Sequence, residues 1–221
     1  MKRPAACLFD LDGLLLDTEP HHSKAWSQAA ARFGLLLLPG QLLSLRGRRR
    51  SDNVDQVRAW IAEASQAVPS AAELLAVQQP IVQRLLQGAA PMPGARELLE
   101  RLRELQVAMA LVTSSGRDAV ERKCAPHPWL EFISERVLGD DPDLGLGKPA
   151  PDPFLLAARR LGVAPGDCWA FEDSLAGAQS ARAAGCVVHV VPGADLPANV
   201  LSELRDCADH LLGSLAELSL D

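Results

Sequence analysis

The sequence predicts an α/β protein whose core is a doubly wound, mainly parallel sheet (Rossmann-like), with an inserted helical cap domain. Three observations lead to this fold class. Short apolar runs alternate with amphipathic helical patterns, one long stretch holds helical patterns alone, and polar residues follow several of the runs. Alternating strands and helices form right-handed βαβ units, which build a parallel sheet covered by helices.

Short apolar runs predict the strands of this sheet. Each run is followed by polar or glycine-containing sequence, as is typical of buried parallel strands. The runs cover residues 5–9, 107–112, 168–171 and 187–191. Helical patterns are predicted between them after Pro93-Gly94, over 152–161 and over 174–184, where Gly185 would end the last one.

The stretch from residue 19 to residue 90 breaks this alternation. Apolar residues recur there at helical spacing over 22–33, 52–64 and 71–86, and no strand pattern appears. The short run 35–38 is interpreted as local packing. Pro91 and Pro93 resist continuation of a helix, so they mark the return to the sheet. We therefore expect a cap domain at 19–90 and a core domain made of 1–18 and 91–221.

Composition limits the class of function. The 221 residues are 48% hydrophobic and 23% charged, which is typical of a globular protein. The net charge of −6 disfavours a nucleic-acid or anionic-membrane partner, and no apolar run approaches the ~20 residues of a membrane span. The five dispersed cysteines suggest reduced thiols. A cytoplasmic monomer is the expectation.

Carboxylates follow two of the predicted strands. Asp10 and Asp12 end the first run, and Glu172 and Asp173 end the third. Taken alone, the first pair is equally well a turn-capping aspartate beside a solvated one. In an open α/β sheet, however, the carboxyl ends of the strands form the ligand site, so these acids would converge and need a cation. Hard oxygen ligands without histidine or cysteine favour Mg²⁺ over zinc.

A hydroxyl-rich turn and a rare lysine complete this edge of the sheet. Thr113 and Ser114 follow the second run, and Lys148 lies on a loop with neighbouring prolines. The turn alone is equally a helix N-cap, and a surface lysine is normally only solvated. Beside the acids, they form a receptacle for a phosphate dianion. Asp10 would then attack phosphorus, and Asp12 would act as general acid and base.

These motifs together resemble the haloacid dehalogenase-like superfamily, in the subgroup with a helical cap after the first strand. The resemblance covers nearly the whole chain: Asp10-Leu-Asp-Gly13, Thr113, Lys148-Pro149 and Glu172-Asp-Ser174 occur in the family's order. It implies a phosphatase whose nucleophile and magnesium ligand is Asp10.

The same resemblance assigns the other roles in this site. Asp12 would be the acid/base residue and would also meet the metal through its carbonyl. Thr113 and Lys148 would hold the phosphate, with Gly13 and Ser114 beside it. Glu172 and Asp173 would complete the metal site, and this pair argues against the superfamily's magnesium-independent dehalogenases.

The cap also resembles that of capped sugar-phosphate enzymes, including β-phosphoglucomutase. His22 and Arg50 would face the substrate, although Arg48–Arg50 could equally form a solvated basic turn. Such a mutase would bring a cap lysine, and the cap has none beyond Lys24. We therefore expect hydrolysis of small phosphorylated metabolites such as sugar, polyol or nucleoside monophosphates. A phosphomutase is the alternative, and a non-catalytic phosphate-binding protein is the third hypothesis.

Overall fold

A computed structural model of the protein describes residues 3–64, 67–86, 88–193 and 196–219. Its centre is a parallel sheet that has six strands within these residues, in the order β3-β2-β1-β4-β5-β6. The strands are β1 (Ala6–Phe9), β2 (Ala108–Val112), β3 (Glu135–Val137), β4 (Cys168–Glu172), β5 (Val187–Val190) and β6 (His210–Leu211). The predicted fold class is confirmed.

The two outermost strands, β3 and β6, were not predicted. They contain three and two residues, and neither forms an apolar run. Glu135 and Arg136 make β3 polar, because an edge strand is only partly covered by the rest of the fold. Strands this short lack the periodic signal on which sequence-based prediction depends.

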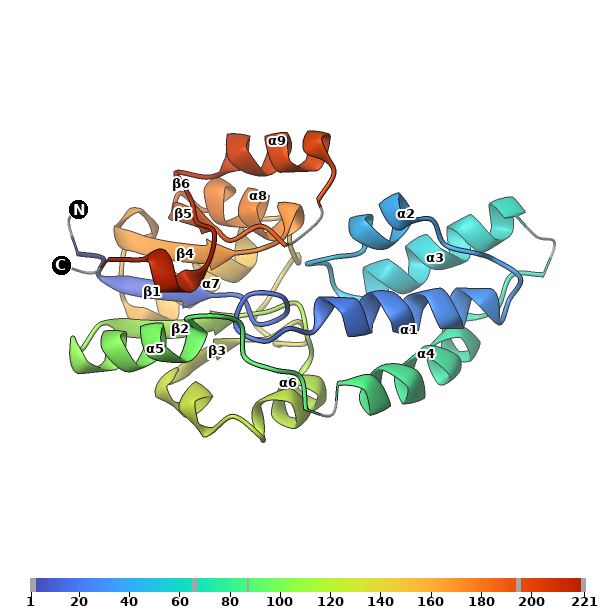
Figure 1. Ribbon diagram of the computed structural model, residues 1–221, viewed down its shortest axis with the longest axis horizontal. Coiled ribbons are helices and arrows are strands. Elements are labelled where there is room, and N and C mark those ends of the chain that lie inside the picture. The colour runs from blue at the N-terminus through green and yellow to red at the C-terminus, as the bar shows by residue number, and fades with distance from the viewer. Residues whose placement is uncertain (1–2, 65–66, 87, 194–195, 220–221) are drawn as a thin grey trace.

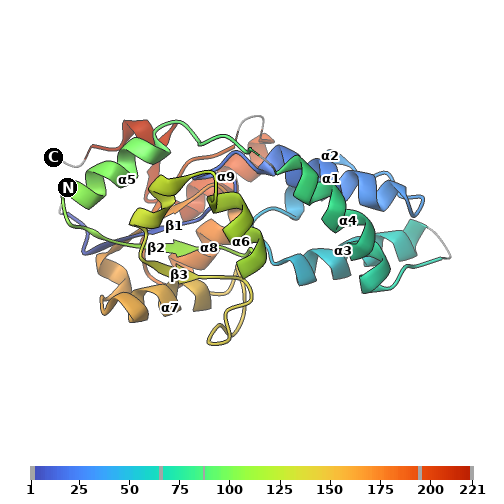
Figure 2. The ribbon, with the colours of Figure 1, turned by 90° about the horizontal axis from the view of Figure 1, so that it is seen from below.

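Helices cover both faces of the sheet, as Figure 2 shows with α5 and α7 on opposite sides of the strands. One face packs against α5 (Ala95–Glu104) and α6 (Arg117–Cys124). The other packs against α7 (Asp152–Leu161), α8 (Leu175–Ala183) and α9 (Ala198–Cys207). Short 3₁₀ turns occur at Pro128–Phe132, Pro165–Asp167 and Leu215–Glu217. Helix α9 was not predicted, whereas Gly185 follows α8 with a positive φ, as expected.

Four helices lie beyond the carboxyl end of β1, to the right of the sheet in Figure 1. They are α1 (Glu19–Ala31), α2 (Pro39–Ser44), α3 (Arg50–Ala64) and α4 (Ala71–Leu85). They pack around a hydrophobic cluster of their own that includes Trp26, Val57 and Leu74. Helix α2 was not predicted; in the run before it, Leu37 is buried whereas Leu36 is 80% exposed.

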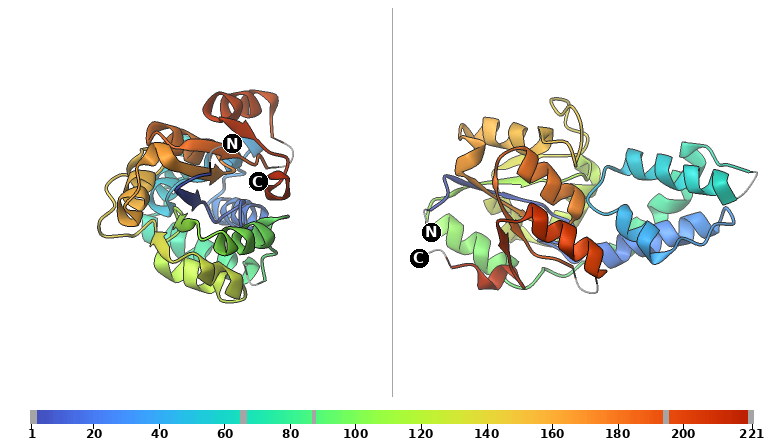
Figure 3. Two further views of the ribbon diagram at one scale, coloured as in Figure 1. Left: turned by 90° about the vertical axis from the view of Figure 1, so that its left-hand side faces the viewer. Right: turned by 90° about the horizontal axis from the view of Figure 1, so that it is seen from above.

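The chain enters and leaves this cap at adjacent positions. The Asp17 amide donates to the Ala90 carbonyl at 2.8 Å, and Leu16 forms an isolated bridge with Pro91. The right-hand view in Figure 3 shows the cap helices to one side of the sheet domain. Within the described residues, no helix combines the length and the apolar character that a membrane crossing requires.

Candidate active site

The carboxyl ends of the central strands bring the predicted polar residues together. Asp10 directly follows β1, Thr113 follows β2, and Glu172 is the last residue of β4. β1 pairs with both β2 and β4, so these three ends are neighbours at one edge of the sheet. The helices that connect strands on one side of β1 cover one face of the sheet, and those that connect strands on the other side cover the opposite face. Open α/β sheets form a ligand-binding crevice at such a position.

Lys148 lies at the centre of this group and is buried. Its Nζ donates to Asp10 Oδ1 at 2.6 Å, to Glu172 Oε1 at 2.5 Å and to the Val112 carbonyl at 2.9 Å. Burial alone would lower the pKa of Lys148, but the two carboxylates outweigh it and raise that pKa. The lysine is therefore a fixed cation at the end of β1.

Three buried carboxylates meet beside Lys148. Oxygens of Asp10, Glu172 and Asp173 lie within 4.8 Å of one another. Burial, followed by the charges of Glu19, Asp10 and Glu172, raises the pKa of Asp173 well above its usual range. Among the described residues, the Asp173 carboxylate has no hydrogen-bond or ion-pair partner. A hard cation satisfies such a set of oxygens, so the residues present fit a metal ion.

Glycines leave the space that these carboxylates occupy. Gly13 has φ +86°, and a Cβ at this position would collide with Asp173 Oδ2. Gly177, in the first turn of α8, lies so close to the Glu172 carboxyl group that a Cβ there would overlap it. A side chain at either position would displace a carboxylate of the acidic cluster.

The Asp12 carboxylate is held by four side chains. Thr18 Oγ1 donates to Oδ1 at 2.6 Å and Ser115 Oγ to Oδ2 at 2.8 Å. Lys123 Nζ lies 2.7 and 2.5 Å from the two oxygens, and His22 Nε2 lies 3.3 Å from Oδ1. Burial raises the pKa of Asp12, but Lys123 and His22 outweigh it and hold that pKa well below its usual range. The arrangement stabilises the base form of Asp12.

Two buried charged residues of this site, Lys123 and Glu19, were missed from the sequence. Lys123 is only 3% exposed and lies on α6, three residues after buried Val120, so a basic residue on a buried helix face was the available signal. Glu19 is buried at the first position of α1 and pairs with Arg46 Nε at 3.3 Å. Nothing in the local sequence distinguishes Glu19 from an ordinary acidic residue in a first helical turn.

Residues of the hydroxyl-rich turn after β2 form hydrogen bonds with three different parts of the protein. Thr113 is buried, and its Oγ1 accepts the Ser115 amide at 3.1 Å. Ser114 Oγ donates to the Gly47 carbonyl of the cap at 2.8 Å, so in this arrangement it links the two parts of the protein. The amide of Arg117 that opens α6 is bound by both Asp140 oxygens at 3.0 Å.

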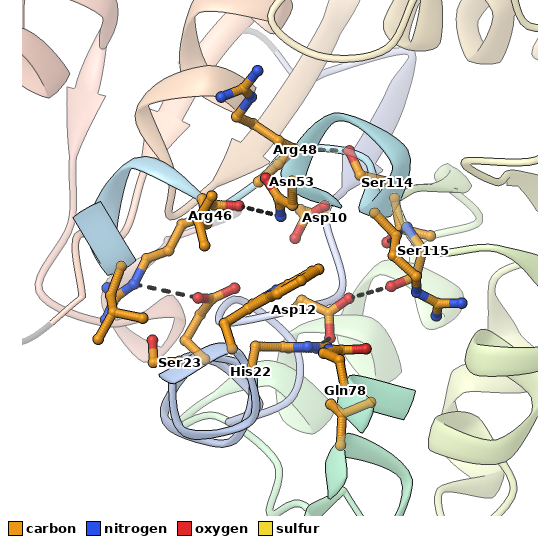
Figure 4. Close-up of a pocket in the computed structure, with 18 of the residues that line it drawn as sticks. Asp10, Asp12, His22, Ser23, Arg46, Arg48, Asn53, Gln78, Ser114 and Ser115 are labelled. Atoms are coloured by element: carbon orange, nitrogen blue, oxygen red, sulfur yellow. Dashed lines mark hydrogen bonds and ion pairs between the residues drawn. The ribbon is translucent and has the colours of Figure 1, made fainter. Parts of the chain in front are cut away.

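A pocket of about 80 Å³ lies between these residues and the cap (Figure 4). Asp10, Asp12, Thr113 and Ser114 line it from the core. From the cap it is lined by His22, Ser23, Trp26, Leu42, Leu45, Arg46, Arg48, Arg50, Asn53, Gln78 and Val82, among others. The predicted cap residues are thus at the pocket, whereas the amides of Asn53 and Gln78 were not expected there.

The three consecutive arginines divide between pocket and core. Arg48 and Arg50 line the pocket, and Arg50 is exposed at the start of α3. Arg49 instead donates from Nη2 to the Gly145 carbonyl of the core at 3.1 Å. The segment is therefore not simply a solvated basic turn.

The chain is similar to known proteins both in sequence and in fold. A family model described as haloacid dehalogenase-like hydrolase matches residues 4–185. A Drosophila melanogaster protein named "Probable pseudouridine-5'-phosphatase" is 35% identical over 98% of this chain and 92% of its own. Hexitol phosphatase A of Escherichia coli is 35% identical over 96% and 92%. The crystal structure of β-phosphoglucomutase from Clostridium difficile shares the fold, with a TM-score of 0.83, 21% identity and coverage of 98% and 93%.

Proposed function

The chain belongs to the haloacid dehalogenase-like hydrolases, and from this membership we propose that it is a phosphatase of small phosphorylated metabolites in which Asp10 is the nucleophile. The observation that carries the proposal is the pairing of two aspartates with different surroundings. Asp10 contacts Lys148 beside the acidic cluster, whereas Asp12 accepts hydrogen bonds from other side chains, among them Lys123. This division separates a nucleophile from an acid/base residue.

We propose Mg²⁺ as the metal ion, held by carboxylate oxygens of Asp10, Glu172 and Asp173 and by the Asp12 carbonyl. The oxygen-only donor set supports this choice over zinc, because the cluster found among the described residues contains no histidine or cysteine. When bound, the ion would neutralise charge on the phosphoryl oxygens.

In the first half-reaction, the free oxygen of Asp10 attacks phosphorus and the bond from phosphorus to the ester oxygen breaks. The departing oxygen takes a proton from Asp12, so an alcohol leaves and an aspartyl-phosphate remains. Thr113 and Lys148 bind phosphoryl oxygens as charge shifts onto them, with Gly13 and Ser114 lining the same volume. Lys148 Nζ already lies 2.6 Å from Asp10 Oδ1, and because its three N–H donors all have acceptors, binding a phosphoryl oxygen exchanges one of these contacts.

In the second half-reaction, water attacks the phosphorus of the aspartyl-phosphate and gives a proton to Asp12. The bond from phosphorus to the Asp10 oxygen breaks, which releases inorganic phosphate and restores the carboxylate. The contacts from Lys123, Thr18 and Ser115 support the base form that this step requires. Asp12 is reprotonated by the water and is ready for the next ester.

We propose that residues 19–90 form the cap domain and that 1–18 with 91–221 form the core domain. The cap supplies His22 and Arg50 to the substrate, and its closure over the strand ends excludes bulk water. The hydrogen bonds Ser114–Gly47 and Arg49–Gly145, together with the contact of His22 with Asp12, support a cap that docks on the core through polar side chains.

The partner class follows from charge and pocket size. We infer that the substrates are small, uncharged alcohols carrying one phosphate, and that nucleic acid and membrane surfaces are not partners of a chain with net charge −6. The five free cysteines support a cytoplasmic location. A monomer is the simplest assembly for a site whose proposed residues all come from one chain.

Phosphate release from sugar, polyol and nucleoside monophosphates, with and without Mg²⁺, tests the proposed function. We expect Mg²⁺-dependent turnover that is abolished by Asp10→Asn. Mass spectrometry of protein quenched during turnover should show an adduct of one phosphoryl group on Asp10. Turnover that survives in Asp10→Asn would contradict the proposed nucleophile.

The phosphomutase alternative gives a different result in the same assay. A mutase would interconvert phosphate esters only after addition of a hexose bisphosphate, and it would release little inorganic phosphate. Within the described part of the cap, Lys24 is exposed on α1 and is absent from the residues lining the pocket, which favours hydrolysis. Absence of both activities would support a non-catalytic phosphate-binding protein.

A further inference from the structure

Two amide side chains of the cap line the pocket and carry buried oxygens without partners among the described residues. Asn53 on α3 is 6% exposed, and Gln78 on α4 is 2% exposed. Among the described residues, neither Asn53 Oδ1 nor Gln78 Oε1 has a hydrogen-bond partner, and both residues line the pocket. Figure 4 shows them on opposite sides of it.

The chemistry of these amides defines the group that would satisfy them. Asn53 Nδ2 donates to the Leu45 carbonyl at 2.9 Å, which fixes the orientation of the amide and leaves Oδ1 as an acceptor. An acceptor in this position requires an O–H or N–H donor. For Gln78, a hydroxyl matches either orientation of the amide, because it both donates and accepts.

Buried acceptors without partners are uncommon because they lose their hydration on folding. Apolar side chains line the same pocket beside its polar and charged groups: Trp26, Leu45 and Val82 are buried and contribute to its wall. A lining that combines apolar side chains with placed polar groups suits a small molecule that has both carbon-bound hydrogens and hydroxyls.

We propose that Asn53 and Gln78 are specificity-determining residues that bind hydroxyl groups of the alcohol esterified to phosphate. The substrate class is therefore a phosphate ester of a polyol or sugar, and simple alkyl phosphates are rejected. The pocket volume of about 80 Å³ corresponds to roughly five to eight water positions, which favours a short polyol. This inference rests on the proposed function, because it assumes that the phosphate lies at Asp10.

Binding by the Asp10→Asn protein in the presence of Mg²⁺ tests the inference independently of turnover. Calorimetry would compare glycerol 3-phosphate with propyl phosphate, which has the same carbon chain and no free hydroxyl. Each amide–hydroxyl pair is expected to contribute about tenfold, so glycerol 3-phosphate should bind roughly 100-fold more tightly. Equal affinities, or no binding of either ester up to ~10 mM, would overturn the inference.

Substitution of Gln78 separates recognition from structure. Gln78→Met keeps the length of the side chain and removes an acceptor that has no partner in the described fold. The melting temperature should therefore stay unchanged or rise, while the preference for glycerol 3-phosphate falls about tenfold. Gln83→Met, at an exposed position of the same helix, is the matched control and should change neither property.

Asn53→Leu should lower the preference by a similar factor but also leaves the Leu45 carbonyl without its donor. If that variant does not fold, Gln78→Met alone decides the matter: an unchanged preference overturns the role of Gln78. Turnover by the unaltered enzyme is measured in parallel. Loss of Mg²⁺-dependent turnover with all esters would refute the proposed function, whereas turnover without hydroxyl preference would refute only this inference.

Discussion

The ammonium group of Lys123 lies 2.7 and 2.5 Å from the two carboxylate oxygens of Asp12, although 111 residues separate them in the chain. Lys123 also donates to Ser115 Oγ at 2.8 Å, and Ser115 in turn donates to Asp12. The last turn of α6 and the turn before this helix thereby hold the Asp12 carboxylate in place. Asp140 binds the first amide of α6, so the position of this helix is itself held from the loop after β3.

Lys123→Met should reduce kcat by about 10²- to 10³-fold, because Asp12 loses the cation that orients its carboxylate. Removing one member of a buried ion pair should also lower the free energy of unfolding by on the order of 3 kcal/mol. Steady-state kinetics and urea denaturation would measure the two effects. Lys24→Met, at an exposed position of α1, is the control. A Lys123→Met protein with unchanged kcat would show that Asp12 does not depend on this contact.

Asp173→Asn should raise the melting temperature of the metal-free protein by a few degrees, because a buried carboxylate repelled by Asp10, Glu19 and Glu172 becomes neutral. Mg²⁺ at 100 times Kd should stabilise the unaltered protein by about 2.7 kcal/mol and so raise its melting temperature, and it should have little effect on the variant. Differential scanning calorimetry with and without Mg²⁺ would measure both. Exposed Asp206→Asn is the control; an equal Mg²⁺ response in Asp173→Asn would argue against its role as a ligand.

His189 should make the protein less stable in mild acid. Burial, followed by the charge of His210, lowers the pKa of His189 from 6.5 to about 4. The unfolded chain therefore binds a proton that the folded chain excludes, and stability falls as pH decreases from about 6.5 towards 4. The loss should be on the order of 2 kcal/mol at pH 5. Urea denaturation at pH 7 and pH 5 would measure it.

His189→Phe is expected to remove most of that loss. Rings of Phe9, Phe171, His189 and His210 form a row across the sheet, with successive centroids 4.7, 4.8 and 4.6 Å apart. Neither ring nitrogen of His189 has a hydrogen-bond partner among the described residues, so a phenyl ring gives up no bond there. An unchanged difference between pH 7 and pH 5 in this variant would assign the effect to other groups.

Gly177→Ala should impair both stability and catalysis. The added methyl group would overlap the Glu172 carboxyl group, which must then leave its position against Lys148. Overpacking of this kind costs about 1–3 kcal/mol. At Gly166 the nearest atom to an added Cβ is 3.8 Å away, so Gly166→Ala is a matched control without overlap. Activity assays and thermal unfolding of the two variants would show whether the shape of this turn matters.

The parts predicted correctly are those in which local sequence decides the outcome. The β1, β2, β4 and β5 runs are mainly apolar because they are largely buried, and the ends of β1, β2 and β4 carry the polar residues of the site. Asp10 and Glu172 are therefore adjacent in any parallel sheet that places β1 beside β4. The roles of the site residues themselves remain predictions.

The parts missed depend on tertiary contacts. Lys123 is one of several charged residues on a short polar helix, and only the packing of α6 against the β1 loop makes it different. Asn53 and Gln78 are ordinary helix residues until α3 and α4 are placed around the pocket. Edge strands β3 and β6 are too short to have a periodicity of their own.

The pairing of Asp17 with Ala90 gives the fold a consequence for its evolutionary history. Because the chain leaves and rejoins the core at neighbouring positions, the cap is an insertion whose two ends lie side by side. A gene could exchange or reshape that insertion while every strand of the sheet kept its neighbours. The cap residues that select the alcohol can therefore change during evolution while Asp10 and the residues around it stay the same.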